Sequence, residues 1–180
     1  MVEIEERELL LHSLKGYLEE LRESGVEELG FAELPFSEDC QGVGNPLARL
    51  LLVMSGAGFA GAAGELLAKI IQAMGFATSD VFLLSFNAGS GGAGSPAREA
   101  VLARIAAVGP EVVVTLGEPA AQLLLQSRQP VEKLRGRFHD LEGIPLLPTL
   151  HPDAMLENPA LKREVWSDMQ QVMRRLAQPA

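Results

Sequence analysis

Cysteine is almost absent from this chain of 180 residues, which contains Cys40 and no other. A disulfide needs two thiols, and a structural zinc or an iron–sulfur cluster held by thiolates needs several. A single cysteine therefore excludes an internal disulfide and any such thiolate-held centre assembled within one chain. We expect no metal and no cofactor.

Positive charge is also scarce, since 15 Lys and Arg residues face 24 Asp and Glu residues, giving a formal net charge of −9. Loose binding to nucleic acid depends on cations that neutralise phosphates, so the composition argues against it. Any such contact must be local. The candidates are two basic clusters, Lys133 with Arg135 and Arg137, and Lys162 with Arg163, although solvated helix faces and loops explain such residues more often.

Long apolar runs are missing too. None that is free of turn residues reaches the roughly 18–20 residues that a membrane-spanning helix requires. The chain starts Met-Val-Glu-Ile-Glu-Glu-Arg, which lacks the basic start of a secretory signal, so we expect a cytoplasmic protein without membrane contact. The length and the hydrophobic share of 47% are typical of one soluble domain, here residues 1–180.

Strand-like and helix-like segments alternate along the chain. Apolar runs predict buried strands at 50–54, 81–84, 111–116 and 144–150, and helical spacing predicts helices at about 61–74, 96–108, 119–126 and from 158 onward. Such alternation indicates a parallel sheet covered by helices on both faces. The expected fold class is α/β, a three-layer α-β-α arrangement around a central four-stranded, mainly parallel sheet.

The remaining stretches have weaker patterns. Residues 1–25 predict an N-terminal amphipathic helix that packs on the same domain. The stretch 30–46, which is punctuated by glycine and proline, is interpreted as an irregular connection. Residues 137–141 can form one more short extended segment, and 87–95 form a Gly/Ser-rich loop.

In open parallel sheets, ligands bind outside the carboxyl ends of the strands, so the loops after these strands are the places to look for chemistry. The first loop contains Gly56-x-Gly58-x-x-Gly61, the spacing with which backbone amides approach a pyrophosphate. A dinucleotide site also requires an acidic residue at the end of the next strand, where this chain has Ser85. A nucleotide- or phosphate-binding module that uses 56–61 is therefore a weak alternative.

The last loop places His151 directly after an apolar strand, and Pro152 fixes the turn behind it. An imidazole in this position could donate a hydrogen bond to negative charge that develops on a ligand. From the residues alone, a structural histidine explains the position equally well. Asp153 is predicted to cap the helix that begins with Ala154.

Several ordered segments carry a resemblance to a known family. They include Leu-Arg-Gly-Arg-Phe-His at 134–139 and Leu-Pro-Thr-Leu-His-Pro at 147–152, together with the runs 44–53, 59–67, 112–121, 143–146 and 162–166. In this order and spacing they resemble the family-four uracil-DNA glycosylases of bacteria, over most of the chain from Gly44 onward. The resemblance implies the uracil-DNA glycosylase fold.

It also implies an activity. Enzymes of this family flip a deoxyuridine out of DNA and hydrolyse its glycosidic bond, with a histidine at the charge that develops on uracil and an aromatic ring stacked on the base. His151 matches the catalytic histidine and Phe59 the stacking ring. The other positions expected around the base are Gly56, Gly58, Ser85, Asn87 and Pro152, and the positions expected on DNA are Arg135 and Arg137. The implied partner is DNA, as a single strand or through the flipped base, bound weakly because the chain is acidic.

Three departures from the family's pattern affect the chemistry. Its first strand runs into Gly-Glu-Ala-Pro-Gly or a close variant and a longer loop, whereas Ser55-Gly56-Ala57-Gly58 here leads directly to Phe59, so that the water-activating carboxylate is deleted. Its second strand ends in Thr-Asn, whose amide reads the uracil edge, whereas Ser85 offers one hydroxyl that Asn87 could supplement. Its iron–sulfur cluster needs four cysteines, whereas this chain contains only Cys40, so we expect the cluster to be absent.

The leading hypothesis is therefore a degenerate uracil-DNA glycosylase-like DNA repair protein that keeps a base-flipping nucleobase pocket and has reduced or absent uracil excision. The alternative is an active, divergent glycosylase in which His151 carries most of the rate, so the enzyme assignment stays open. Both hypotheses require that His151 and Phe59 face each other across a hollow of the size of a base.

Overall fold

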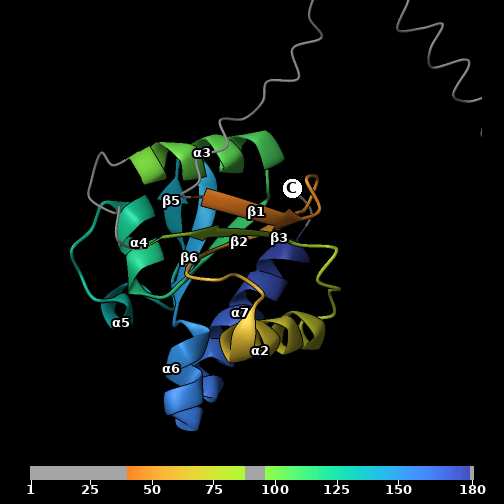
Figure 1. Cartoon of the computed structure of the whole chain (residues 1–180), viewed down its shortest axis with the longest axis vertical. Coiled ribbons are helices and arrows are strands. Elements are labelled where there is room, and N and C mark those ends of the chain that lie inside the picture. Colours follow the sequence, from red (N-terminus) through yellow and green to blue (C-terminus); the bar gives the residue numbers. More distant parts are fainter. Residues whose placement is uncertain (1–39, 88–95, 179–180) are drawn as a thin grey trace, which may run out of the picture. The chain divides into compact units, whose positions relative to one another are not determined.

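The computed structural model of the chain describes residues 40–87 and 96–178. The helix predicted at 1–25 and most of the Gly/Ser-rich loop lie outside these residues. The described part contains a six-stranded sheet in the order β1-β3-β2-β4-β6-β5, with helices on its two faces (Figure 1). No helix within 40–87 or 96–178 is long and apolar enough to cross a membrane.

The four central strands are the predicted ones, and all of them run parallel. They are β2 (Leu50–Ser55), β3 (Phe82–Phe86), β4 (Val112–Leu116) and β6 (Ile144–Thr149). Burial on both faces explains their continuous apolar sequences, because helices cover each side of a parallel sheet. The α/β prediction is confirmed, with two more strands than the four expected.

Both additional strands are antiparallel and lie at the edges of the sheet. β5 (His139–Leu141) pairs with β6 and agrees with the extended segment expected at 137–141. β1 (Cys40–Gly44) pairs with β3, so the interpretation of 40–44 as irregular was wrong. Gly44 is needed for close packing, since a Cβ built on it would lie 2.0 Å from the Val81 carbonyl oxygen.

Helices cover the sheet in two layers. α2 (Gly61–Ala73), α6 (Pro152–Glu157) and α7 (Lys162–Leu176) supply apolar side chains to one core cluster, and α3 (Pro96–Val108) and α4 (Glu118–Leu125) supply most of the helical side chains of the other. The short helices α5 (Val131–Leu134) and η2 (Pro159–Leu161) connect longer elements. Figure 1 shows α3 on the opposite side of the strands from α2 and α7.

The side chains of β2 point alternately into the two core clusters. Leu50, Leu52 and Met54 belong to the cluster with α2 and α7, whereas Leu51 and Val53 belong to the cluster with α3 and α4. Successive residues of a strand point to opposite faces, so one buried strand supplies both cores. The three-layer prediction is confirmed.

Candidate functional site

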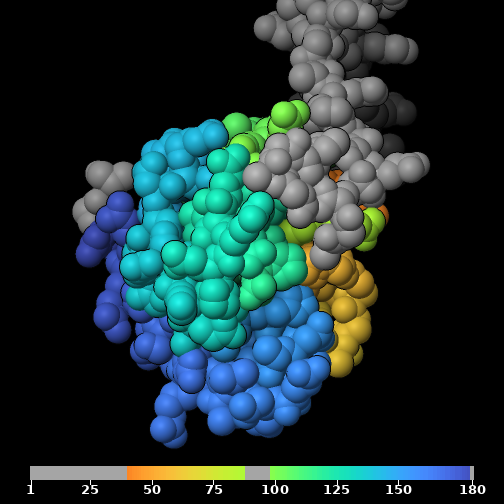
Figure 2. All heavy atoms as spheres, turned by 90° about the vertical axis from the view of Figure 1, so that its left-hand side faces the viewer, coloured from red at the N-terminus to blue at the C-terminus, as the bar shows by residue number. Residues whose placement is uncertain are grey.

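The carboxyl ends of the four parallel strands meet at one edge of the sheet. The Gly56 amide donates to the Phe86 carbonyl over 3.0 Å, and the Gly117 amide donates to the Thr149 carbonyl over 2.8 Å. These bonds join the end of β2 to that of β3 and the end of β4 to that of β6. Figure 2 shows that the segment after β4, in teal, and the segment after β6, in blue, adjoin on one face of the molecule. The loops singled out from the sequence therefore lie together at this end of the sheet.

His151 lies at the centre of this edge. Its Nε2 is 3.2 Å from the Ser55 carbonyl oxygen, and its Nδ1 is 3.2 Å from the Asp153 amide nitrogen. A carbonyl can only accept and an amide N–H can only donate, so Nε2 carries the proton and Nδ1 offers its lone pair. The side chain is 19% exposed. Nε2 is thus an oriented N–H donor on a ring that can be reached from solvent.

Gly117 makes room for that ring. It follows β4 with a φ of 90°, and a Cβ built on it would lie 2.9 Å from the His151 Cβ and 3.3 Å from its Cδ2. Such distances are closer than side chains tolerate. Gly117 therefore gives the imidazole its place, and the backbone conformation also favours glycine there.

The cap of α6 differs from the prediction. His151, not Asp153, is the N-cap residue, and its ring nitrogen accepts from the Asp153 amide while buried Pro152 takes the first helical position. Proline suits that position because its missing N–H would have no helical partner. The Asp153 carboxylate lies in the first turn, 3.2 Å from Nδ1, where it would pair with a protonated ring. The capping bond holds the imidazole through Nδ1, the ring nitrogen that does not face Ser55.

The glycine loop after β2 lies against the end of β3. A Cβ on Gly58 would approach the Ser85 Oγ to 3.5 Å, which is ordinary contact, so these two predicted residues are neighbours. Gly56, Gly58 and Gly61 all have positive φ, which explains the glycine spacing by backbone geometry. Asn87 is exposed just beyond β3. The amides of Gly56 and Ala60 already donate to the Phe86 and Ala57 carbonyls.

Phe59 is half-buried and packs against the core cluster of α2, α6 and α7. Its backbone touches α2 so closely that a Cβ on Gly64 would lie 2.1 Å from the Phe59 carbonyl carbon. These contacts give Phe59 a packing role at the start of α2. Its stacking role and the hollow between Phe59 and His151 stay predictions.

The two arginines expected on DNA have different surroundings. Arg135 is mostly buried, with Nη2 at 2.9 Å and Nε at 3.1 Å from Oδ2 of Asp168, and its Nη1 pairs with Glu164. These ion pairs explain Arg135 as a structural residue. Arg137 is exposed. Contact with DNA by either arginine stays a prediction.

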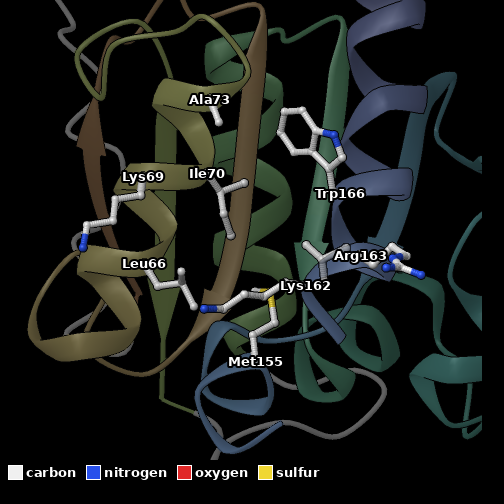
Figure 3. Close-up of a pocket in the computed structure, with 9 residues that line it drawn as sticks. Leu66, Lys69, Ile70, Ala73, Met155, Lys162, Arg163 and Trp166 are labelled. Atoms are coloured by element: carbon white, nitrogen blue, oxygen red, sulfur yellow. The ribbon is translucent and has the colours of Figure 1, made fainter. Parts of the chain in front are cut away.

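A separate groove of about 370 Å³ lies between α2 and α7 (Figure 3). Its lining is mostly apolar, with Leu66 and Ile70 on α2 facing Trp166 on α7. Lys69, Lys162 and Arg163 also line it, which places the second basic cluster here. None of the predicted site residues lines this groove, so it is distinct from the His151 site.

Cys40 does not fit an iron–sulfur site. It is buried on β1, where burial raises the pKa of its thiol and the charge of Arg104 offsets part of that rise. Cluster ligands are thiolates, which a raised pKa disfavours, and a cluster needs several of them. The described residues also contain no group of three or more His, Cys, Asp or Glu that could hold a metal ion.

Burial of Cys40 has a measurable consequence. Its thiol should react with Ellman's reagent far more slowly in the native protein than in urea, because the raised pKa lowers the fraction of thiolate and burial keeps the sulfur from the reagent. The absorbance of the released thiolate follows the reaction. A native rate equal to the rate in urea would contradict this burial.

The family of the chain follows from comparison with known proteins. Residues 44–170 match the family model described as the uracil DNA glycosylase superfamily, which is more than half of the chain. The chain belongs to this superfamily.

Several relatives carry a more specific name. Type-4 uracil-DNA glycosylase of Saccharolobus solfataricus is 26% identical over 162 residues, covering 76% of this chain and 75% of the relative. The type-4 enzyme of Archaeoglobus fulgidus is 26% identical over 156 residues (73% and 78% covered), and that of Thermotoga maritima is 29% identical over 150 (72% and 78% covered). The family match favours the glycosylase interpretation over the nucleotide-binding alternative.

Sequence reasoning missed the residues that hold the histidine. The Ser55 carbonyl and the Asp153 amide are backbone groups, which no sequence pattern marks. Gly117 does follow a predicted strand and could have been found by that position. Asp168 could have been found as an acidic residue on the apolar face of the last helix, between Val165 and Val172.

Proposed function

We propose that this chain is a uracil-DNA glycosylase-like DNA repair protein that binds a flipped base beside His151 and excises uracil slowly. The observation that carries the proposal is the His151 ring, which is held with Nε2 as a donor at the carboxyl ends of the parallel strands. Membership of the superfamily and the type-4 relatives support the same reaction class.

The His151 donor is suited to the bond that breaks. As the glycosidic bond lengthens, negative charge gathers on the uracil oxygens, and an N–H placed at such an oxygen lowers the barrier. In the structure this N–H donates to the Ser55 carbonyl. A bound base would take that place, so the Ser55 bond keeps the donor oriented until the base arrives.

Slow excision follows from the loop after β2. In the described residues, Ser55 to Phe59 turn directly into α2 and supply no carboxylate to position or activate a water. General-base assistance contributes about 10²–10⁴ in rate where it is present. The donor alone therefore leaves a low rate.

Ser85 and Asn87 determine how strictly the pocket reads uracil. Ser85 offers one hydroxyl, which can donate and accept but lacks the paired geometry of an amide. Loss of an amide that both donates to and accepts from the base weakens discrimination between substrates. We propose that exposed Asn87, two residues on, contributes the amide contact.

An excision assay tests the function. The full chain, in excess over a labelled uracil-containing oligonucleotide, single- or double-stranded, should produce alkali-labile abasic sites at least about a hundredfold more slowly than the type-4 enzyme of Thermotoga maritima assayed beside it. The same oligonucleotide with thymine is the control and should stay intact. Equal rates for the two proteins would show that the missing carboxylate does not matter, and no abasic sites after prolonged incubation would overturn the proposed excision.

A further inference from the structure

A buried charge lies behind the His151 loop. Asp168 on α7 is 2% exposed and is the one buried acidic residue among those that the structure describes. Its Oδ2 accepts three hydrogen bonds, from Nε and Nη2 of Arg135 and, over 2.6 Å, from the Thr149 hydroxyl. A buried carboxylate needs such partners, because an unpaired one would lose its hydration without compensation.

Thr149 connects this charge to the site. It is fully buried as the last residue of β6, and His151 follows two residues later. Its side chain bonds Asp168, while its backbone carbonyl accepts from the Gly117 amide over 2.8 Å. The residue that ends the strand is therefore fixed from α7 on one side and from the Gly117 turn on the other.

The imidazole has little tolerance for movement at this point. Gly117 already leaves the ring just enough room, and the Nε2 to Ser55 distance of 3.2 Å is at the long end of a hydrogen bond. A shift of the strand end would move His151 against Gly117 or away from Ser55. Displacements of about 1 Å in catalytic geometry can lower rates about a hundredfold.

We propose that Thr149, Asp168 and Arg135 are positioning residues that orient His151 through the end of β6, in a network that joins three segments far apart in the sequence. The inference rests on the proposed function for its kinetic consequence. Thr149 and Asp168 are buried, so their effect on catalysis passes through the histidine.

Thr149→Val removes the hydroxyl and keeps the branched shape. It should lower kcat for uracil excision at least about tenfold while KM changes less than about twofold, because the histidine is misplaced and the binding surface is kept. Thr149→Ser restores the hydroxyl and should restore most of the rate. Asp168→Asn is the second variant, for use if Thr149→Val does not fold, and should show the same split between kcat and KM.

Thr115→Val is the matched control. Thr115 is also fully buried, on the neighbouring strand β4, and its hydroxyl has no hydrogen-bond partner among the described residues. Removing this hydroxyl should leave kcat unchanged. An equal loss in Thr115→Val and Thr149→Val would overturn the proposal, because it would reflect general disturbance of the sheet.

A nuclear magnetic resonance experiment reads the histidine without any turnover. Long-range ¹H–¹⁵N spectra of the full chain, with His151 assigned by its loss in His151→Asn, should show the Nε2–H tautomer in the wild type and in Thr115→Val. In Thr149→Val this signal should shift or average between tautomers. If Thr149→Val leaves both the signal and kcat unchanged, the positioning role is overturned. If the wild type does not excise uracil, the proposed function fails, and the spectrum alone then tests the positioning role.

Discussion

His151→Asn is expected to lower the rate of uracil excision about a hundredfold to a thousandfold, the range measured when one donor to a developing anion is removed. Asparagine is shorter, and its amide cannot reach from the α6 cap to the place of Nε2 beside the Ser55 carbonyl. Single-turnover assays with protein in excess over the uracil oligonucleotide measure the loss in the bond-breaking step.

His139→Asn is the matched control for that variant. His139 is also half-buried and also bonds a backbone carbonyl through Nε2, that of Leu134 at 2.9 Å, but it lies on the edge strand β5. It should keep the wild-type rate if the protein stays folded, as its thermal melting would show. A His151→Asn protein within about twofold of the wild type would remove His151 from the mechanism.

The fold was largely predictable because buried strands and helices have characteristic patterns of apolar residues. β2 and β4 are covered on both faces, so each appears as a mostly apolar run, and the helices between them have helical spacing. β1 gave no such signal. Only Cys40 of its five residues is buried, and Gly42 and Gly44 allow close contact with β3 where the sequence indicated turns.

The position of His151 could be predicted from the sequence, but the groups that orient its ring could not. His151 stands out because it follows a predicted strand, at the edge where parallel sheets bind ligands. The bonds that orient it come from the Ser55 carbonyl and the Asp153 amide, which every residue type possesses. The pairing of Arg135 with Asp168 joins residues 33 positions apart, and the sequence alone offered Arg135 as a surface cation.

Asp168→Ala is expected to lower the free energy of unfolding by about 3 kcal/mol, since it leaves Arg135 without its main partner and the Thr149 hydroxyl without an acceptor. The lower end of the range for broken buried pairs applies because the Arg135 side chain is 17% exposed and keeps Glu164. Urea unfolding followed by circular dichroism measures the change. Glu111→Ala, which breaks the exposed pair with Arg49, is the control and should have a much smaller effect.

The triple variant Arg135→Met, Thr149→Val, Asp168→Leu separates two physical causes. If the loss in Asp168→Ala comes from stranded polar groups, replacing all three polar partners with apolar side chains should return the free energy of unfolding to within about 1 kcal/mol of the wild type. If the ion pair itself supplied the stability, the triple variant would remain as unstable as Asp168→Ala. A stable triple variant with lost excision would mean that the network serves the orientation of His151 more than the stability of the fold.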